Sequence, residues 1–155
     1  FLEQYLETPV QLSLEKIIQR NSLILNLSIA SEAISEIAKR SRGTPRIANN
    51  LLRWVRDYAQ IHTESQADLI TVNAALKMLC IDEHGLDEMD KKILQTMIHH
   101  YQGGPVGLGT VAIAVGEEKS TIEEVYEPYL ILKGFLKRTA RGREVTELAH
   151  LLDFK

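Results

Sequence analysis

The sequence predicts a mainly α-helical protein with two domains, and three observations support this prediction. Apolar residues recur every three or four positions in four stretches between residues 14 and 79, with short breaks between the stretches. Three further stretches of this kind lie in residues 87–129, and two short runs in residues 135–146 suit a β-hairpin. We therefore expect a four-helix domain over residues 1–83, and over residues 84–155 three helices followed by a hairpin. That order is typical of a winged helix.

The first domain is expected to hold four amphipathic helices. Ser13 is a candidate cap for the first helix, Pro45 begins the third, and Thr71 is a candidate cap for the short fourth helix. Residues 82–85 then have the composition of a linker. The residues expected to face the core are, helix by helix, Leu14, Ile17, Ile18 and Leu25; Ala33, Ile34, Ile37 and Ala38; Ala48, Leu51, Leu52, Val55, Tyr58 and Ala59; and Ala74, Ala75 and Leu79.

The second domain is expected to begin with a helix that Asp87 opens and Gly103-Gly104-Pro105 ends. A second helix is predicted from Leu108 to Val115, where Gly116 stops it. The residues of the first of these helices expected on one face are Ile93, Leu94, Met97, Ile98 and Tyr101.

The third helix and the hairpin complete this domain. Ser120 to Glu123 fits a capping box, and Pro128 should bend the helix that follows. The residues expected to face inward are Ile122, Val125, Tyr126 and Tyr129. The expected strands run from Phe135 to Thr139 and from Arg143 to Thr146, joined through Gly142.

The stretch from Arg40 to Ala48 predicts an anion site at a helix start. Gly43 suits a left-handed position after a helix, Thr44 can cap the next helix, and Pro45 tolerates its first position. Arg46 would then stand among unpaired backbone N–H groups at the positive end of a helix dipole, where a phosphate is favoured. A well-capped helix with a surface arginine explains the same spacing and stays open as an alternative.

Charge is unevenly distributed, although the net charge is only −3. Residues 128–143 hold no carboxylate, whereas residues 117–127 hold five Glu and one Lys. The predicted third helix would present Glu123, Glu124 and Glu127, which argues against base reading in the major groove. We expect contacts with DNA phosphates instead, which carry no sequence information. A solvated basic hairpin is the alternative. The candidate DNA-binding residues are Lys119, Lys137, Arg138, Arg141 and Arg143.

Other chemistry is not favoured by the sequence. Residues 104–110 imitate a phosphate-binding loop but lack its lysine, and the dinucleotide-type glycines of residues 107–112 do not follow a buried strand. His99 and His100 are adjacent, so on a helix they diverge by about 100° and do not share a metal easily. We expect no catalytic residue and no metal site in this chain. The glycine-rich stretch is interpreted as the turn before a helix.

Composition limits the class of protein. The chain of 155 residues is 45% hydrophobic and 25% charged, which is ordinary for soluble globular proteins. It contains no run of 18 apolar residues, so no membrane span is expected. Cys80 is the single cysteine, which excludes an internal disulfide and fits a reducing cytoplasm, and we expect it to pack as a small hydrophobe. Because it begins at Phe1 without a signal peptide, we interpret the chain as a piece of a longer protein.

Five blocks, in order along the chain, resemble the RuvB family of AAA+ motors that drive branch migration of Holliday junctions. The blocks are residues 40–60, 85–90, 103–108, 127–131 and 134–143. The chain departs from the family at Asn50 and Trp54, where arginines are usual, and at Thr8 and Pro9, where an aromatic residue near the adenine is usual.

The resemblance implies an AAA+ lid over residues 1–83 and a DNA-binding winged helix over residues 84–155. It implies that Arg46 is the sensor-2 arginine near the γ-phosphate, and that Lys119, Arg138 and Arg143 occupy DNA-backbone positions. The family's Walker A and B segments would lie upstream, so ATP or ADP with Mg²⁺ would bind the longer protein and not this piece tightly.

Further implications concern the whole motor. The resemblance implies a homo-hexamer that acts on duplex and four-way-junction DNA with RuvA and the resolvase RuvC, in recombination, repair and the SOS response. Two alternatives stay open: a winged-helix transcriptional regulator, and a protein-binding winged helix of another AAA+ machine.

Overall fold

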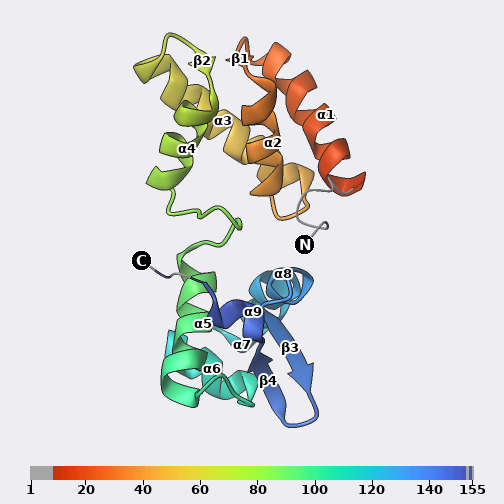
Figure 1. Ribbon diagram of the computed structural model, residues 1–155, viewed down its shortest axis with the longest axis vertical. Helices are drawn as coiled ribbons and strands as arrows, with labels where there is room; N and C mark the ends of the chain where they lie inside the picture. The colour runs from red at the N-terminus through yellow and green to blue at the C-terminus, as the bar shows by residue number, and fades with distance from the viewer. Residues whose placement is uncertain (1–8, 153, 155) are drawn as a thin grey trace. The chain divides into compact units, whose positions relative to one another are not determined.

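The computed structural model describes residues 9–152 and 154, and it divides into two compact units after Leu86 (Figure 1). Unit 1 is the part up to Leu86, and unit 2 begins at Asp87. Both units are mainly helical, and the predicted fold class is confirmed. In the described part of the chain, no helix combines the length and the apolar character that crossing a bilayer requires.

Unit 1 packs four helices around one core. The helices are α1 (Pro9–Ile24), α2 (Ser31–Lys39), α3 (Pro45–His62) and α4 (Leu69–Met78). The α2 and α3 helices each contact the other three helices. Two short strands, β1 (Ser28–Ile29) and β2 (Gln66–Ala67), pair in parallel between the helices, and the sequence analysis did not predict them. Most of the predicted core residues are buried, including Ile18, Ile37, Ala48, Leu52, Val55, Ala59 and Ala75.

The helix caps in unit 1 follow the expected chemistry at one position and differ at two. Thr44 caps α3 as predicted, because its Oγ1 accepts from the Ile47 N–H at 3.4 Å. The α4 cap is Asp68, whose carboxylate accepts from the Thr71 N–H at 2.8 Å, so the prediction of Thr71 was wrong. Ser13 lies inside α1 and donates to the Pro9 carbonyl at 3.0 Å, so it is not a cap either. Asp68 lies three residues before Thr71, the usual spacing between an N-cap and the N–H it accepts from.

Unit 2 begins with the predicted helices. Asp87 and Asp90 form a reciprocal capping box at the start of α5 (Glu88–Tyr101), and the left-handed Gln102 ends this helix before Gly103. The α6 helix (Leu108–Val115) stops at the left-handed Gly116, as expected. Its first residue follows directly after Gly107, which confirms that the glycine-rich stretch is a turn and a helix start.

The third helix of unit 2 is interrupted. It consists of a short α7 (Lys119–Thr121), a π-helical turn (Ile122–Tyr126) and α8 (Glu127–Leu132). The predicted capping box at Ser120 was wrong, because the helix begins at Lys119 after Glu118 and no side chain caps it. A π turn closes after five residues instead of four, so it shifts the later residues around the helix axis. Val125 is therefore exposed, and not buried as predicted, while Tyr129 is buried as predicted.

The hairpin of unit 2 consists of β3 (Leu136–Thr139) and β4 (Gly142–Val145), followed by a short α9 (Glu147–His150). Because Thr139 pairs with Gly142, the turn residues are Ala140 and Arg141, and the glycine belongs to the strand. Each strand begins one residue away from its predicted start. On its other side β4 also pairs with Val106, whose N–H and carbonyl exchange hydrogen bonds with Arg143 at 2.9 and 2.7 Å.

One prediction about a single residue was also wrong. Cys80 does not pack as a small hydrophobe, because it is exposed just after α4. It adopts a positive φ of 57° there, so the chain turns sharply at this position. His99 and His100 are both exposed.

Candidate nucleic-acid interface and nucleotide-facing helix start

Two of the predicted DNA-binding arginines meet at one buried carboxylate in unit 2. Arg143 donates from Nε to Glu127 Oε2 at 2.9 Å and from Nη2 to Oε1 at 3.1 Å. Arg138 donates from Nε to the same Oε1 at 2.5 Å. The side chain of Glu127 is fully buried, whereas those of Arg143 and Arg138 are 20% and 53% exposed. The carboxylate therefore lies beneath two guanidinium groups that reach the surface.

The position of Glu127 follows from the π turn. Ile122 and Glu127 are both fully buried and lie five residues apart, which is the π-helical spacing. The sequence analysis placed Glu127 on the exposed face of a regular helix, and that was wrong. The Glu127 carboxylate raises the pKa of Arg143 above its ordinary value, mainly through the hydrogen bonds between them. The carboxylate therefore both stabilises the positive charge of Arg143 and orients its guanidinium.

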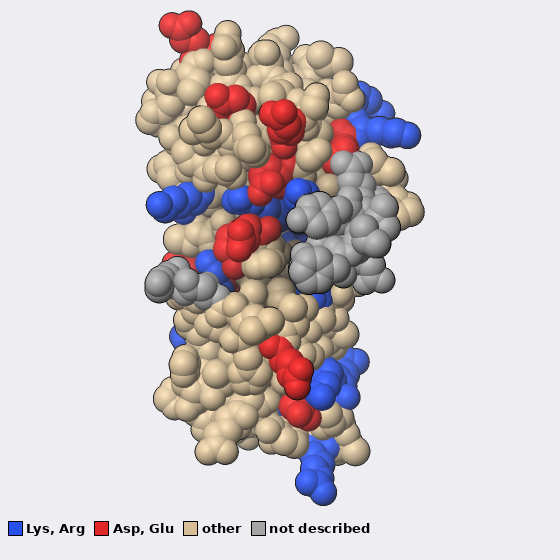
Figure 2. Space-filling model, viewed as in Figure 1, with Lys and Arg blue, Asp and Glu red and all other residues tan. Residues whose placement is uncertain are grey.

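The other basic residues of the interface are less constrained. Lys137 forms an exposed ion pair with Glu144 across the hairpin, with 3.7 Å between Nζ and Oε1. Arg141 is exposed in the turn, and Lys119 is exposed at the start of α7. Figure 2 shows basic side chains over the hairpin and its tip, with carboxylates beside them. The surface of the wing, which is the β3–β4 hairpin, therefore carries charges of both signs and is not uniformly basic.

Arg46 lies where the sequence predicted, in the first turn of α3. Pro45 and Arg46 are the first two residues of this helix, and Arg46 is exposed. A surface pocket of about 260 Å³ lies beside this helix start, and its lining is mostly apolar. The residues of the pocket wall are Pro9, Val10, Ser13, Leu14, Ile17, Gly43 and Pro45. Thr8, one of the two positions where the chain lacks the family's usual aromatic residue, lies outside the described residues.

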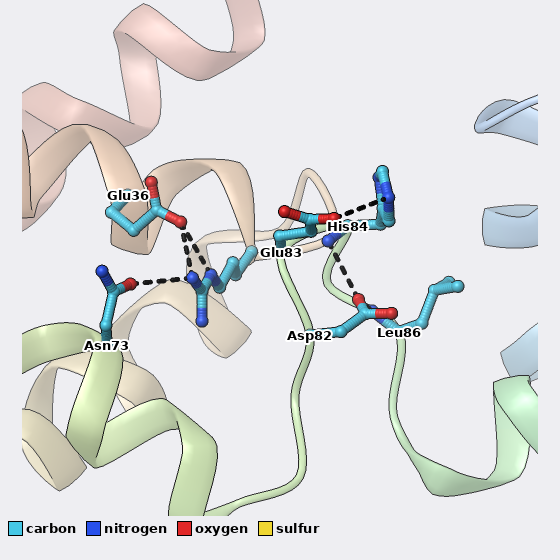
Figure 3. A network of polar contacts seen from close by, with 7 residues as sticks. Glu36, Asn73, Asp82, Glu83, His84 and Leu86 are labelled. Carbon is cyan, nitrogen blue, oxygen red and sulfur yellow. Dashed lines mark hydrogen bonds and ion pairs between the residues drawn. The ribbon is translucent and has the colours of Figure 1, made fainter. Parts of the chain in front are cut away.

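Arg40, in the same segment, has a structural role that the sequence analysis missed. Its side chain is 9% exposed, and its guanidinium donates to the Glu36 carboxylate from Nε at 2.9 Å and to the Asn73 amide oxygen from Nη2 at 2.8 Å (Figure 3). These contacts join α2 to α4 beneath the loop that leads to Arg46. The spacing of Glu36 and Arg40, four residues apart on a helix, is the sequence signal that could have indicated this pair.

The linker predicted at residues 82–85 is ordered by its own hydrogen bonds. The Asp82 carboxylate accepts from the N–H groups of His84 and Leu86, both at 2.9 Å (Figure 3). Arg42 donates to the Gly85 carbonyl at 3.3 Å, which ties the loop before α3 to this turn. Within residues 9–152 and 154, the structure brings together no group of three His, Cys, Asp or Glu residues that could hold a metal ion.

A four-helix unit followed by a winged helix places the chain among proteins that carry an AAA+ lid and a C-terminal winged helix. Residues 10–82 match the RuvB AAA lid domain, and residues 83–152 match the RuvB C-terminal winged helix domain. The chain belongs to the RuvB family.

Two relatives agree with this assignment. The chain is 68% identical over 137 residues to the Holliday junction branch migration complex subunit RuvB of Protochlamydia amoebophila, covering 88% of this chain and 41% of that protein. It is 55% identical over 138 residues to the subunit of the same name from Lactobacillus johnsonii, covering 89% and 41%. The chain thus spans about two fifths of the length of these relatives.

A solved structure is similar as well. The Thermotoga maritima RuvB Holliday junction branch migration motor matches with a TM-score of 0.87 and 47% sequence identity, over 90% of this chain and 47% of that one. The transcriptional-regulator alternative is therefore not favoured.

Proposed function

We propose that this chain provides the lid, over residues 1–83, and the DNA-gripping winged helix, over residues 84–155, of an ATP-driven motor for Holliday-junction branch migration. The observation that carries the proposal is the pair of guanidinium groups held at the surface by Glu127. Guanidinium groups on a hairpin can contact phosphates, and phosphate contacts carry no sequence information. A motor that moves along any DNA sequence requires this kind of contact.

The proposed contact with DNA phosphates involves few residues. Arg138 and Arg143 are the central contacts, with Lys119, Lys137 and Arg141 around them. Glu123 and Glu124 are exposed on the interrupted helix and would repel phosphates, so this helix does not enter a groove with that face. The wing, and not this helix, therefore makes the main contact with the DNA backbone.

In unit 1, Arg46 faces the nucleotide in this proposal. An exposed guanidinium in the first turn of α3 adds its charge to the helix dipole, which favours the γ-phosphate of ATP with its Mg²⁺. The apolar pocket beside Pro45 offers a surface for the less polar part of the nucleotide. Within the longer protein, hydrolysis would then move the lid.

The assembly is part of the same proposal. The partners are duplex and four-way-junction DNA, RuvA and RuvC, and a homo-hexameric ring increases the affinity of each weak wing through avidity. A cytoplasmic location follows, because chromosomal junctions form there. Recombination, repair and the SOS response are the corresponding processes.

Titration of duplexes with unrelated sequences, over a series of salt concentrations, tests the grip. If about three phosphates are neutralised, log affinity should fall against log salt with a slope of about −3. Arg138→Ala and Arg143→Ala should each weaken binding to every duplex alike and reduce the slope by about one. Arg53 is an exposed arginine in unit 1, so Arg53→Ala is the matched control. It should leave both the DNA affinity and the salt slope unchanged.

Two outcomes would contradict the proposal. Strong preference for one duplex sequence would revive the regulator alternative. Absence of DNA affinity at low salt would favour a protein-binding winged helix.

The chain alone should not hydrolyse ATP. Phosphoryl transfer requires a P-loop lysine and a carboxylate that holds Mg²⁺, and the sequence contains no G-x-x-x-x-G-K-[ST] segment. Phosphate release above that of a mock preparation, surviving a second purification, would show that this expectation is wrong.

A further inference from the structure

The register of the hairpin places two like charges directly opposite each other. Arg138 on β3 pairs with Arg143 on β4. The backbone N–H and carbonyl of Arg143 are both bonded to Val106 on its other side, so this is the non-hydrogen-bonded type of pair. Side chains are closest in that type, and opposed like charges destabilise a sheet. A compensating negative charge is therefore expected next to this pair of arginines.

Glu127 supplies the compensating charge and sets the geometry. Its carboxylate accepts hydrogen bonds from Nε and Nη2 of Arg143 and from Nε of Arg138, so both carboxylate oxygens are occupied. Nη1 and Nη2 of Arg138, and Nη1 of Arg143, take no part in these bonds with Glu127. These nitrogens carry N–H donors in a fixed fork, and phosphate oxygens fit such a fork.

The backbone of β4 next to these arginines is also closely constrained. A Cβ on Gly104 would lie 2.4 Å from the Arg143 carbonyl oxygen, so the loop before α6 packs directly against β4. Glu127 cannot turn outward without opening its fully buried position. The two guanidinium groups are therefore ordered before DNA arrives, and less conformational entropy is lost on binding.

From this geometry we propose that Glu127 is a positioning residue for the DNA contact: it holds Arg138 and Arg143 as one preorganised pair whose remaining N–H groups receive one backbone phosphate. This inference rests on the phosphate grip proposed above. Glu127 itself touches no DNA in this arrangement and acts only through the two arginines.

Positioning and simple charge counting predict opposite effects of removing the carboxylate. The cluster of two arginines and one glutamate carries a net charge of +1. The Glu127→Gln variant would carry +2, so charge counting predicts tighter binding to DNA. Positioning predicts weaker binding, because each long side chain must then be ordered during binding.

The experiment compares Glu127→Gln with Glu123→Gln in the salt-series titration. Glu123 is the matched control, because it is exposed on the same helix and acts on Arg143 through its charge. Glu127→Gln should weaken DNA binding by roughly fivefold or more, from the loss of order in two long side chains. Glu123→Gln should bind at least as tightly as wild type. Glu127→Gln binding as tightly as Glu123→Gln would overturn the proposal.

The wild-type chain provides a second measurement that does not depend on how Glu127→Gln folds. The Nε–H protons of Arg138 and Arg143, observed by NMR, should exchange with water more slowly than that of the exposed Arg141. Equal exchange rates at the three sites would show that Glu127 does not hold the pair.

The results for these variants also distinguish this inference from the proposed contact of the arginines with DNA phosphates. If Arg138→Ala and Arg143→Ala bind DNA as wild type does, the grip itself is wrong and this inference fails with it. If both weaken binding and Glu127→Gln does not, the grip stands and only the positioning role is lost.

Discussion

A Cβ on Gly142 would lie 2.5 Å from the carbonyl oxygen of Val106, which is so close that the segment around Val106 would have to move away from β4. Gly142 also has a φ of 137°, which residues with side chains rarely adopt. The bridge between Val106 and Arg143 depends on this close approach, so glycine is required next to Arg143.

We expect Gly142→Ala to destabilise unit 2 by about 1 to 3 kcal/mol, from backbone strain and the lost bridge. The measurement is chemical denaturation followed by NMR signals of unit 2. Gly109→Ala is the matched control: it lies in α6 with nothing within 4 Å of the added Cβ. That control should be neutral, or more stable by up to about 1 kcal/mol because alanine favours helices. Equal stability of both variants would show that the close approach is unimportant.

Arg40→Ala should destabilise unit 1 by about 1 to 3 kcal/mol, because it leaves the largely buried Glu36 carboxylate without its cation. Trp54 is the only tryptophan, and its indole donates to the Ala75 carbonyl at 2.7 Å, so its fluorescence reports the unfolding of unit 1. Arg53→Ala, on the exposed side of α3, should change stability by no more than about 0.5 kcal/mol. A similar small change for Arg40→Ala would indicate that the network is not stabilising.

Arg46→Ala should affect nucleotide chemistry in the longer protein without affecting the fold. Losing a charge-assisted contact to the γ-phosphate should remove roughly 1.5 to 3 kcal/mol of interaction, so ATPase and branch-migration rates should fall together. The melting temperature of this chain should hardly change, because Thr44 and Pro45 still begin α3. A variant with wild-type ATPase rates would exclude Arg46 from the nucleotide site.

Glu144→Gln should strengthen DNA binding by a few fold, in contrast to Glu127→Gln. Glu144 forms only an exposed ion pair with Lys137, and such pairs contribute roughly 0 to 1 kcal/mol. Removing its charge frees Lys137 for a phosphate and reduces repulsion at the wing. The salt-series titration measures the change, with Glu32→Gln on α2 of unit 1 as the control. Weaker binding by Glu144→Gln would mean that the pair orients Lys137.

Much of this protein could be predicted from local sequence patterns. The start of α3 at Thr44 and Pro45, the Asp87 cap and the stop of α6 at Gly116 depend on contacts between residues a few positions apart. Such contacts leave a clear trace in a short segment. The incorrect cap at Thr71 was an error of the same local kind, since Asp68 offers the cap three residues earlier.

Local patterns were thus enough to predict the helical domains, the hairpin and the basic residues of the wing. The burial of Glu127 beneath Arg138 and Arg143 depends on tertiary contacts, because those partners lie 11 and 16 residues further along the chain. A π turn moved the glutamate off the exposed face, and a regular 3.6-residue period does not reveal such a turn. The pairing of β1 with β2 is a second case, because two-residue strands leave no periodic signal and are formed by contacts between distant segments.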